Sequence, residues 1–240
     1  MTVGIRVAAL ALALAVGASP NRAAGGESWR PSFGRLAVTQ GLAAHCRDAP
    51  TAERCAKAIE KSQVASGRFR RIGDLLVVKI PNGRDVELRD APVDKVGTNP
   101  DVAASRFAYV EFLASSGQHL VHVWGYEGSE SLLVDARTGT RTRLFGLPIP
   151  SPSGSRIACS LANLAVDMQG VEVWRRAKDG FVRDWASGLA WLPAPPTWLG
   201  EDCIRIGALD PARTGQPLGA GTTTATFHRT REAWAEVPAK

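Results

Sequence analysis

The chain has 240 residues, of which 45% are hydrophobic and 22% are charged, a composition typical of a globular protein. A chain of this length holds one sheet-rich domain or two small ones and can bury a core of its own. The net charge of +6 comes from scattered arginines rather than from a basic stripe interleaved with aromatic residues. This pattern argues against nucleic-acid binding and leaves a modest attraction to anionic envelope surfaces.

The first residues have the pattern of a secretory signal peptide. Arg6 precedes an uncharged run over 7–16, and Val16-Gly17-Ala18 offers the small side chains that a signal peptidase reads. A buried helix or a membrane anchor is the alternative, but the run is shorter than the ~20 residues that span a bilayer. We therefore predict a signal peptide over 1–18, a linker over 19–35, and an exported chain, periplasmic or secreted, without a membrane span.

The four cysteines fit an oxidising compartment, where three pairings are possible. Cys46 and Cys55 are close in sequence, within "HCRDAPTAERC", which suggests a staple across a helical hairpin. Cys159 and Cys203 would then form a second disulfide between two strands. The spacing provides no Cys-x-x-Cys pair and no well-placed histidine, so we predict neither a metal site nor a cofactor.

Residues 36–67 predict a helical hairpin because they are rich in alanine and poor in β-branched side chains. The segments "AVTQGLAAHC" and "TAERCAKAIEKSQVAS" each predict a helix. Pro50 ends the first helix, Thr51 is a candidate N-cap of the second, and Gly67 is a candidate stop.

Residues 68–230 predict about ten or eleven short, mostly antiparallel strands. Apolar-rich runs near 75–80 and 84–89 flank the turn Pro81-Asn82-Gly83, and Asn-Gly is a strong hairpin signal. Similar turns follow at Ser115-Ser116-Gly117, Thr138-Gly139 and Asp179-Gly180. The predicted fold class is therefore mainly β, with a short N-terminal helical hairpin and a loose C-terminal tail over 231–240.

A strand pair around "VDARTG" is followed by the turn Ser151-Pro152-Ser153-Gly154 and the strand "SRIAC". This order resembles the blade junction of β-propeller repeats of the WD40-like and TolB-like sort, found in exported bacterial proteins. The resemblance implies partial or small propeller-like sheets and a binding platform, with no particular activity. Ser153 stands where the repeats carry an acid, so a calcium or charge-network role for that acid does not carry over.

Candidate catalytic residues are few, and we predict none. The chain lacks the Gly-x-Ser-x-Gly motif of serine hydrolases. His119 and His122 are three residues apart on a predicted strand, which places them on opposite faces. Glu127, Glu130 and Asp135 cluster around "GYEGSESLLVD", but their spacing does not specify the two carboxyls that a glycosidase needs.

Seven tryptophans allow stacking on sugars or peptides, although most lie in or beside predicted strands and are expected in the core. The segment "WLPAPPTW" is the exception, because its prolines favour an extended chain. Trp191 and Trp198 are therefore candidate ligand-facing aromatics. Alternatively, the segment covers the open edge of a sheet.

These features favour a non-enzymatic binding or interaction module of the cell envelope, with a protein or glycan partner. An alternative is an envelope hydrolase that acts on glycan or peptide through acids near Glu127, Glu130 and Asp135. A third hypothesis is a purely structural envelope component.

Overall fold

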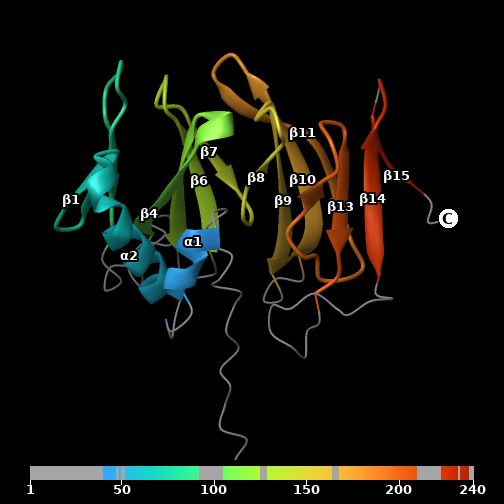
Figure 1. Cartoon of the computed structure of the whole chain (residues 1–240), viewed down its shortest axis with the longest axis horizontal. Coiled ribbons are helices and arrows are strands. Elements are labelled where there is room, and N and C mark those ends of the chain that lie inside the picture. Colours follow the sequence, from blue (N-terminus) through green and yellow to red (C-terminus); the bar gives the residue numbers. More distant parts are fainter. Residues whose placement is uncertain are drawn as a thin grey trace, which may run out of the picture.

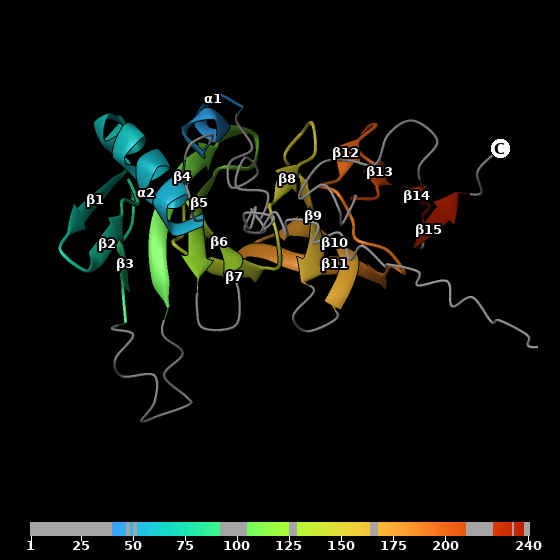
Figure 2. The same cartoon turned by 90° about the horizontal axis from the view of Figure 1, so that it is seen from below.

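The computed structural model describes residues 40–46, 49, 52–91, 105–124, 129–163, 168–209, 223–231 and 233–237. The predicted signal peptide and linker lie outside these residues. The described chain is mainly β, as expected, and forms four small antiparallel sheets. The sheets stand side by side in chain order (Figure 1), and the view from below shows the same row (Figure 2).

The hairpin predicted over 36–67 is helical over most of its described residues, and its expected disulfide is formed, whereas Pro50 and Thr51 lie outside the described residues. Its elements are α1 (Gln40–Ala43), the 3₁₀ turn η2 (Ala44–Cys46), α2 (Ala52–Gln63) and the 3₁₀ turn η3 (Val64–Ser66). A disulfide joins Cys46 to Cys55, whose Cα atoms lie 4.6 Å apart. Gly67 ends the hairpin with a φ of 66°, a left-handed conformation that glycine adopts at low cost.

The first and second sheets are meanders of consecutive strands. The first sheet has the order β1 (Phe69–Ile72), β2 (Leu75–Val78), β3 (Val86–Arg89). The second has the order β4 (Arg106–Leu113), β5 (Gln118–Trp124), β6 (Ser129–Asp135), β7 (Arg141–Leu144). The 3₁₀ turn η5 (Ala114–Ser116) connects β4 to β5.

The third and fourth sheets repeat the meander. The third contains β8 (Ile149–Pro150), β9 (Arg156–Asn163), β10 (Met168–Ala177) and β11 (Gly180–Gly188). The fourth contains β12 (Thr197–Trp198), β13 (Cys203–Gly207), β14 (Thr224–Arg229) and β15 (Trp234–Val237). We expected a loose tail over 231–240, but β15 forms within it because Trp234 is buried in the core at 6% exposure.

Three apolar cores fill the spaces between neighbouring sheets. The first core, between the first and second sheets, contains Phe69, Leu76, Val78, Ile80, Val86, Leu88, Phe107, Tyr109, Val121, Val123, Leu132 and Val134. The second core joins the hairpin to the second and third sheets through Cys46, Ala49, Cys55, Ile59, Val110, Leu113, Leu120, Leu133, Leu144, Ile157, Cys159 and Phe181. The third core, between the third and fourth sheets, contains Ala158, Val171, Val173, Ile204, Ile206, Ala225, Phe227 and Trp234.

The predicted disulfide between Cys159 and Cys203 is not formed, and both thiols are free. Cys159 lies in the second core, whereas its neighbour Ala158 faces the fourth sheet from the third core. On the fourth sheet, Ile204 points into the third core, so the adjacent Cys203 points to the opposite face. The two cysteines therefore lie on faces of different sheets that point away from each other.

The outer faces of the two end sheets mix exposed charged and apolar side chains, among them Ile72 on the first sheet and Val237 on the fourth. On the first sheet, Arg70, Glu87 and Arg89 are exposed and point away from the first core by register. On the fourth sheet, the exposed Arg205 and His228 point away from the third core. Closure into a ring would cover these faces with another sheet. The described sheets thus form an open stack.

The hairpin turns form two parallel rows at one end of the stack. The first turn row consists of the β4–β5, β8–β9 and β12–β13 turns. The second turn row consists of the β2–β3, β6–β7 and β10–β11 turns. Within the second sheet, the Ala136 N–H donates to the Gly117 carbonyl at 3.0 Å, and within the third, the Arg176 N–H donates to the Ser155 carbonyl at 2.8 Å. These bonds place the two rows next to each other.

Backbone packing fixes the first turn row. Gly154 has a φ of +70°, and a Cβ atom built there would lie 1.9 Å from the Ser115 carbonyl oxygen of the neighbouring sheet. Such an approach of two backbones requires glycine.

We expect Gly154→Ala to lower the free energy of unfolding by at least about 3 kcal/mol, because the strained φ and the backbone clash add together. Gly117→Ala is the matched control, since its φ is +59° but a Cβ there meets nothing within 4 Å. It should cost only about 1 kcal/mol. Urea unfolding of both variants measures the difference, and equal losses would show that the sheets are not in contact at this turn.

Candidate functional site

Three charged side chains cover the outer edge of β4. The Tyr109 N–H donates to the Glu60 carboxylate of α2 at 2.8 Å, and the Phe107 N–H donates to the Asp90 carboxylate at 2.8 Å. The Arg71 guanidinium donates to the Phe107 carbonyl at 2.5 Å. Backbone groups that an additional strand would pair are therefore satisfied by side chains.

Arg71 also holds the two acids together. Its Nε and Nη2 donate to the two Glu60 oxygens at 2.9 and 2.8 Å, the bidentate geometry that suits a carboxylate. Its Nη1 lies 3.4 Å from an Asp90 oxygen. The Glu60 side chain is only 12% exposed. We name this group the β4 edge network; each of its charges has an opposite charge or a backbone partner, which is typical of a structural role.

Substitution of Glu60 by Ala should lower the free energy of unfolding by about 3 kcal/mol or more, because the buried Tyr109 N–H and the partly buried Arg71 lose their acceptor. Glu53→Ala removes an acid from the same helix, but Glu53 is 32% exposed and pairs with Lys57 and Arg106 at the surface. This control should cost less than about 1 kcal/mol. Chemical unfolding compares the two, and a Glu60 effect as small as that of Glu53 would contradict the structural role.

The acids of the hydrolase hypothesis do not converge. Glu127 lies outside the described residues. Glu130 and Asp135 lie at opposite ends of β6, five residues and therefore about 17 Å apart, and on opposite faces. Glu130 pairs with Arg143 at 3.2 Å. A glycosidase pair requires carboxyls within about 5–10 Å, so these two acids do not form one.

Asp135 instead organises the β6–β7 turn. Its Oδ1 accepts hydrogen bonds from the backbone N–H groups of Arg137 and Thr138, each at 2.9 Å, and its Oδ2 accepts one from the Gln118 side chain at 2.9 Å. Burial raises the pKa of the Asp135 carboxyl, but these hydrogen bonds outweigh it and leave the pKa below its usual value. The carboxylate is thus committed to the turn.

His119 and His122 lie on opposite faces of the second sheet, as predicted, but both are buried, at 2% and 5% exposure. In the first core, the His119 Nδ1 lies 3.1 Å from the Tyr109 hydroxyl. On the other face, the His122 ring stacks on Trp124, and among the described residues its Nε2 has no hydrogen-bond partner. Burial lowers the pKa of both, and Arg68 contributes for His119, to about 4 in each case.

These lowered pKa values predict that the fold is sensitive to acid. In the unfolded chain, each histidine binds a proton as the pH falls through about 6.5, whereas in the folded protein it stays neutral down to about 4. The contribution of these two histidines to the free energy of unfolding is therefore fully present above pH 6.5. It is lost as the pH falls from 6.5 to 4, by about 3 kcal/mol per histidine.

The variant His122→Leu should reduce this pH dependence by about half, because one of the two histidines no longer titrates. Free energies of unfolding at pH 7.5, 5.5 and 4.5 measure the slope. His228→Leu, an exposed histidine on β14, is the control and should keep the slope of the parent chain. An unchanged slope in His122→Leu would overturn this assignment.

The structure places Trp191 and Trp198 against the third core, where both are half-buried. The Trp198 indole N–H donates to the Ile149 carbonyl of the third sheet at 2.8 Å, and its ring meets Trp234 edge-on. The Ala194 N–H donates to the Gly207 carbonyl at 2.7 Å, so the proline-rich segment lies along β13. This arrangement matches the alternative in which the segment covers a sheet edge.

The turn Ser151-Pro152-Ser153-Gly154 contacts a carboxylate that belongs to the fourth sheet. Glu201, in the β12–β13 turn, accepts hydrogen bonds from the Ser153 N–H at 2.5 Å, the Ser153 hydroxyl at 2.7 Å and the Ser155 hydroxyl at 3.3 Å. Sequence reasoning missed this role because Glu201 is 48 positions away from Ser153. The charge at this turn is therefore present, but a neighbouring turn supplies it.

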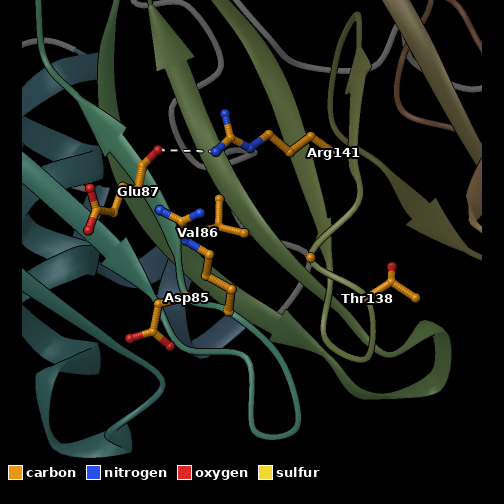
Figure 3. A pocket seen from close by; sticks show the side chains of 7 residues that line it. Asp85, Val86, Glu87, Thr138 and Arg141 are labelled. Atoms are coloured by element: carbon orange, nitrogen blue, oxygen red, sulfur yellow. Dashed lines mark hydrogen bonds between the residues drawn. The ribbon is translucent and has the colours of Figure 1, made fainter.

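A shallow groove of about 300 Å³ opens between the first and second sheets, at the second turn row. Its walls are formed by Arg84, Asp85, Val86, Glu87, Thr138, Gly139 and Arg141. Figure 3 shows the carboxylates of Asp85 and Glu87 turned away from the Arg141 guanidinium, which reaches across the groove.

Two arginines and two acids line the groove, and Lys79 beside it brings the balance to a small positive excess. The Asp85 carboxylate is neutralised by Lys79 at 2.7 Å, and the Lys79 hydrogen bond lowers the pKa of Asp85. Arg141 donates to the Glu87 backbone carbonyl at 3.2 Å, a neutral acceptor that leaves its charge uncompensated. Arg84 is exposed. Such a groove can hold an anionic group, but it brings together no nucleophile and base.

In the described ranges, no group of three or more His, Cys, Asp or Glu side chains is placed to hold a metal ion. No helix in the same ranges is both long and apolar enough to cross a membrane. Comparison with protein-family models, curated proteins and solved structures finds no match to the chain.

Proposed function

We propose that this chain is an exported, non-enzymatic binding module of the cell envelope, built as an open stack of propeller-like sheets. Export is supported by the signal-peptide pattern before Ala18 and by the Cys46–Cys55 disulfide, a bond that persists in oxidising compartments. The propeller-like arrangement is supported by four consecutive meanders with a core at each of their three junctions.

The observation that carries the binding function is the groove at the second turn row. Loops at one end of a rigid sheet scaffold are the usual place for a binding site, because the scaffold tolerates their variation. Here the groove walls come from two different sheets, and Arg141 spans them by its bond to the Glu87 carbonyl. Arg141 bonds to a neutral carbonyl oxygen, so its positive charge can still attract an anionic ligand. In the β4 edge network, by contrast, Arg71 is paired with the carboxylates of Glu60 and Asp90.

A photo-crosslinking amino acid at Thr138 tests this proposal. Thr138 is an exposed groove residue. When the cells that naturally make the protein express the modified chain, irradiation should therefore give a discrete crosslinked species in the envelope fraction. Its yield should fall several-fold when Arg141→Gln is added, because the guanidinium would no longer hold the ligand.

The same crosslinker at Thr197, exposed on the short edge strand β12 of the fourth sheet, is the control and should not give that species. Equal products from both positions, or a product insensitive to Arg141→Gln, would refute a binding site in the groove.

A further inference from the structure

The groove belongs to a longer row of cations. Arg84 lies in the β2–β3 turn, Arg137 and Arg141 flank the β6–β7 turn, and Lys178 lies in the β10–β11 turn; all four are exposed. We name these four residues the cationic row. The Arg137 guanidinium donates to the Lys178 carbonyl at 2.8 Å, which joins the second sheet to the third.

The turns of this row are in contact across the sheets. A Cβ atom built on Gly139 would lie 3.1 Å from the Val86 side chain, and one built on Gly180 would lie 3.2 Å from the Thr140 methyl group. Since packed sheets are about 10 Å apart, the row runs roughly 20 Å across three sheets. The positions of the cations are set by this packing.

The positive charges in the row exceed the negative ones. Arg137 and Arg141 bond to backbone carbonyls, and Asp85 is paired with Lys79. Two exposed acids oppose the row, Asp179 beside Lys178 and Glu87 in the groove wall, so four cations face two carboxylates. Guanidinium groups held by carbonyls keep further N–H donors for an anion.

The neighbouring first turn row has a different character. There Glu201 keeps a carboxylate among Ser153 and Ser155, and burial, which alone would raise its pKa, is outweighed by these hydrogen bonds, which lower it. A flat anionic membrane laid on this end would meet both rows, including Glu201. A linear polymer can follow the second turn row alone.

We propose that the cationic row binds a linear polyanion, a polymer with phosphate or carboxylate groups, along the second turn row. This inference rests on the proposed function and names its ligand class. Binding of this kind releases counterions, so it weakens steeply with salt.

The test measures binding of the whole chain to linear inorganic polyphosphate and to poly-L-glutamate by fluorescence anisotropy. We expect binding at 50 mM salt that weakens roughly tenfold at 150 mM. The double variant Arg137→Gln with Arg141→Gln should lower the affinity for the polymer roughly tenfold at fixed salt, because each lost ionic contact lowers it about threefold. Arg205→Gln, an exposed arginine on the outer face of the fourth sheet, should leave it unchanged.

A second pair of variants guards against loss of folding. Arg84→Gln with Lys178→Gln removes two charges but keeps the Lys178 carbonyl that Arg137 uses. This pair should give a similar loss, and Arg137→Lys with Arg141→Lys should keep most of the binding.

Three outcomes overturn the polymer proposal: no binding to either polymer at 50 mM salt, equal effects of Arg205→Gln and the row variants, or binding confined to vesicles of equal parts phosphatidylglycerol and phosphatidylcholine. If the polymers fail while the Thr138 crosslink depends on Arg141, the binding module stands and only its ligand class is wrong. If both fail, the proposed function falls with it.

Discussion

The outer edge of β4, which no neighbouring strand pairs, is the constraint on which the rest of the structure depends. An edge strand in the middle of a stack presents backbone donors and acceptors that must be satisfied or hydrated. In this protein Glu60, Arg71 and Asp90 supply the missing partners for Phe107 and Tyr109. Glu60 comes from α2, Arg71 from β1 and Asp90 from the segment after β3, so one network fixes the helix and the first sheet against the second.

The remaining junctions use the same principle with other groups. Between the second and third sheets, Arg176 lies 3.8 Å from the Asp135 carboxylate and donates to the Ser116 carbonyl. Between the third and fourth, Asp184 accepts from the Trp234 indole at 3.2 Å. Each apolar core is thus closed by polar contacts at its rim. Cores supply most of the burial energy, whereas directional bonds set how the sheets are aligned.

Charge is used in two ways in this molecule. In the β4 edge network and at Glu201, charges meet partners within the fold, so they stabilise and orient it. In the cationic row, arginines bond to carbonyl oxygens, which fixes their position without cancelling their charge. This difference, rather than the number of arginines, sets the proposed binding surface apart from the structural networks.

The sequence by itself determined the local structure. Alanine content predicted the helical hairpin, the short spacing of Cys46 and Cys55 predicted their disulfide, and turn residues predicted most strands. Strand β1 (Phe69–Ile72) was missed because two of its four residues are arginines, and one of these, Arg71, enters the sheet as an ion-pair partner. Strand β15 was missed because its order depends on the burial of Trp234 against residues far away in the chain.

Only the tertiary structure decided which distant groups meet. The sequence offered Cys159 with Cys203 and Glu130 with Asp135 as pairs, and the fold separates both. The cysteines lie on faces of different sheets, and the two acids lie at opposite ends and on opposite faces of β6. The sequence did not suggest Glu201 with Ser153, nor a row that contains Arg84, Arg137 and Lys178. Contacts between turns of different sheets follow from the stacking of the sheets, and this register has no signature within any one segment. The sequence therefore determined the elements, and packing determined the surfaces.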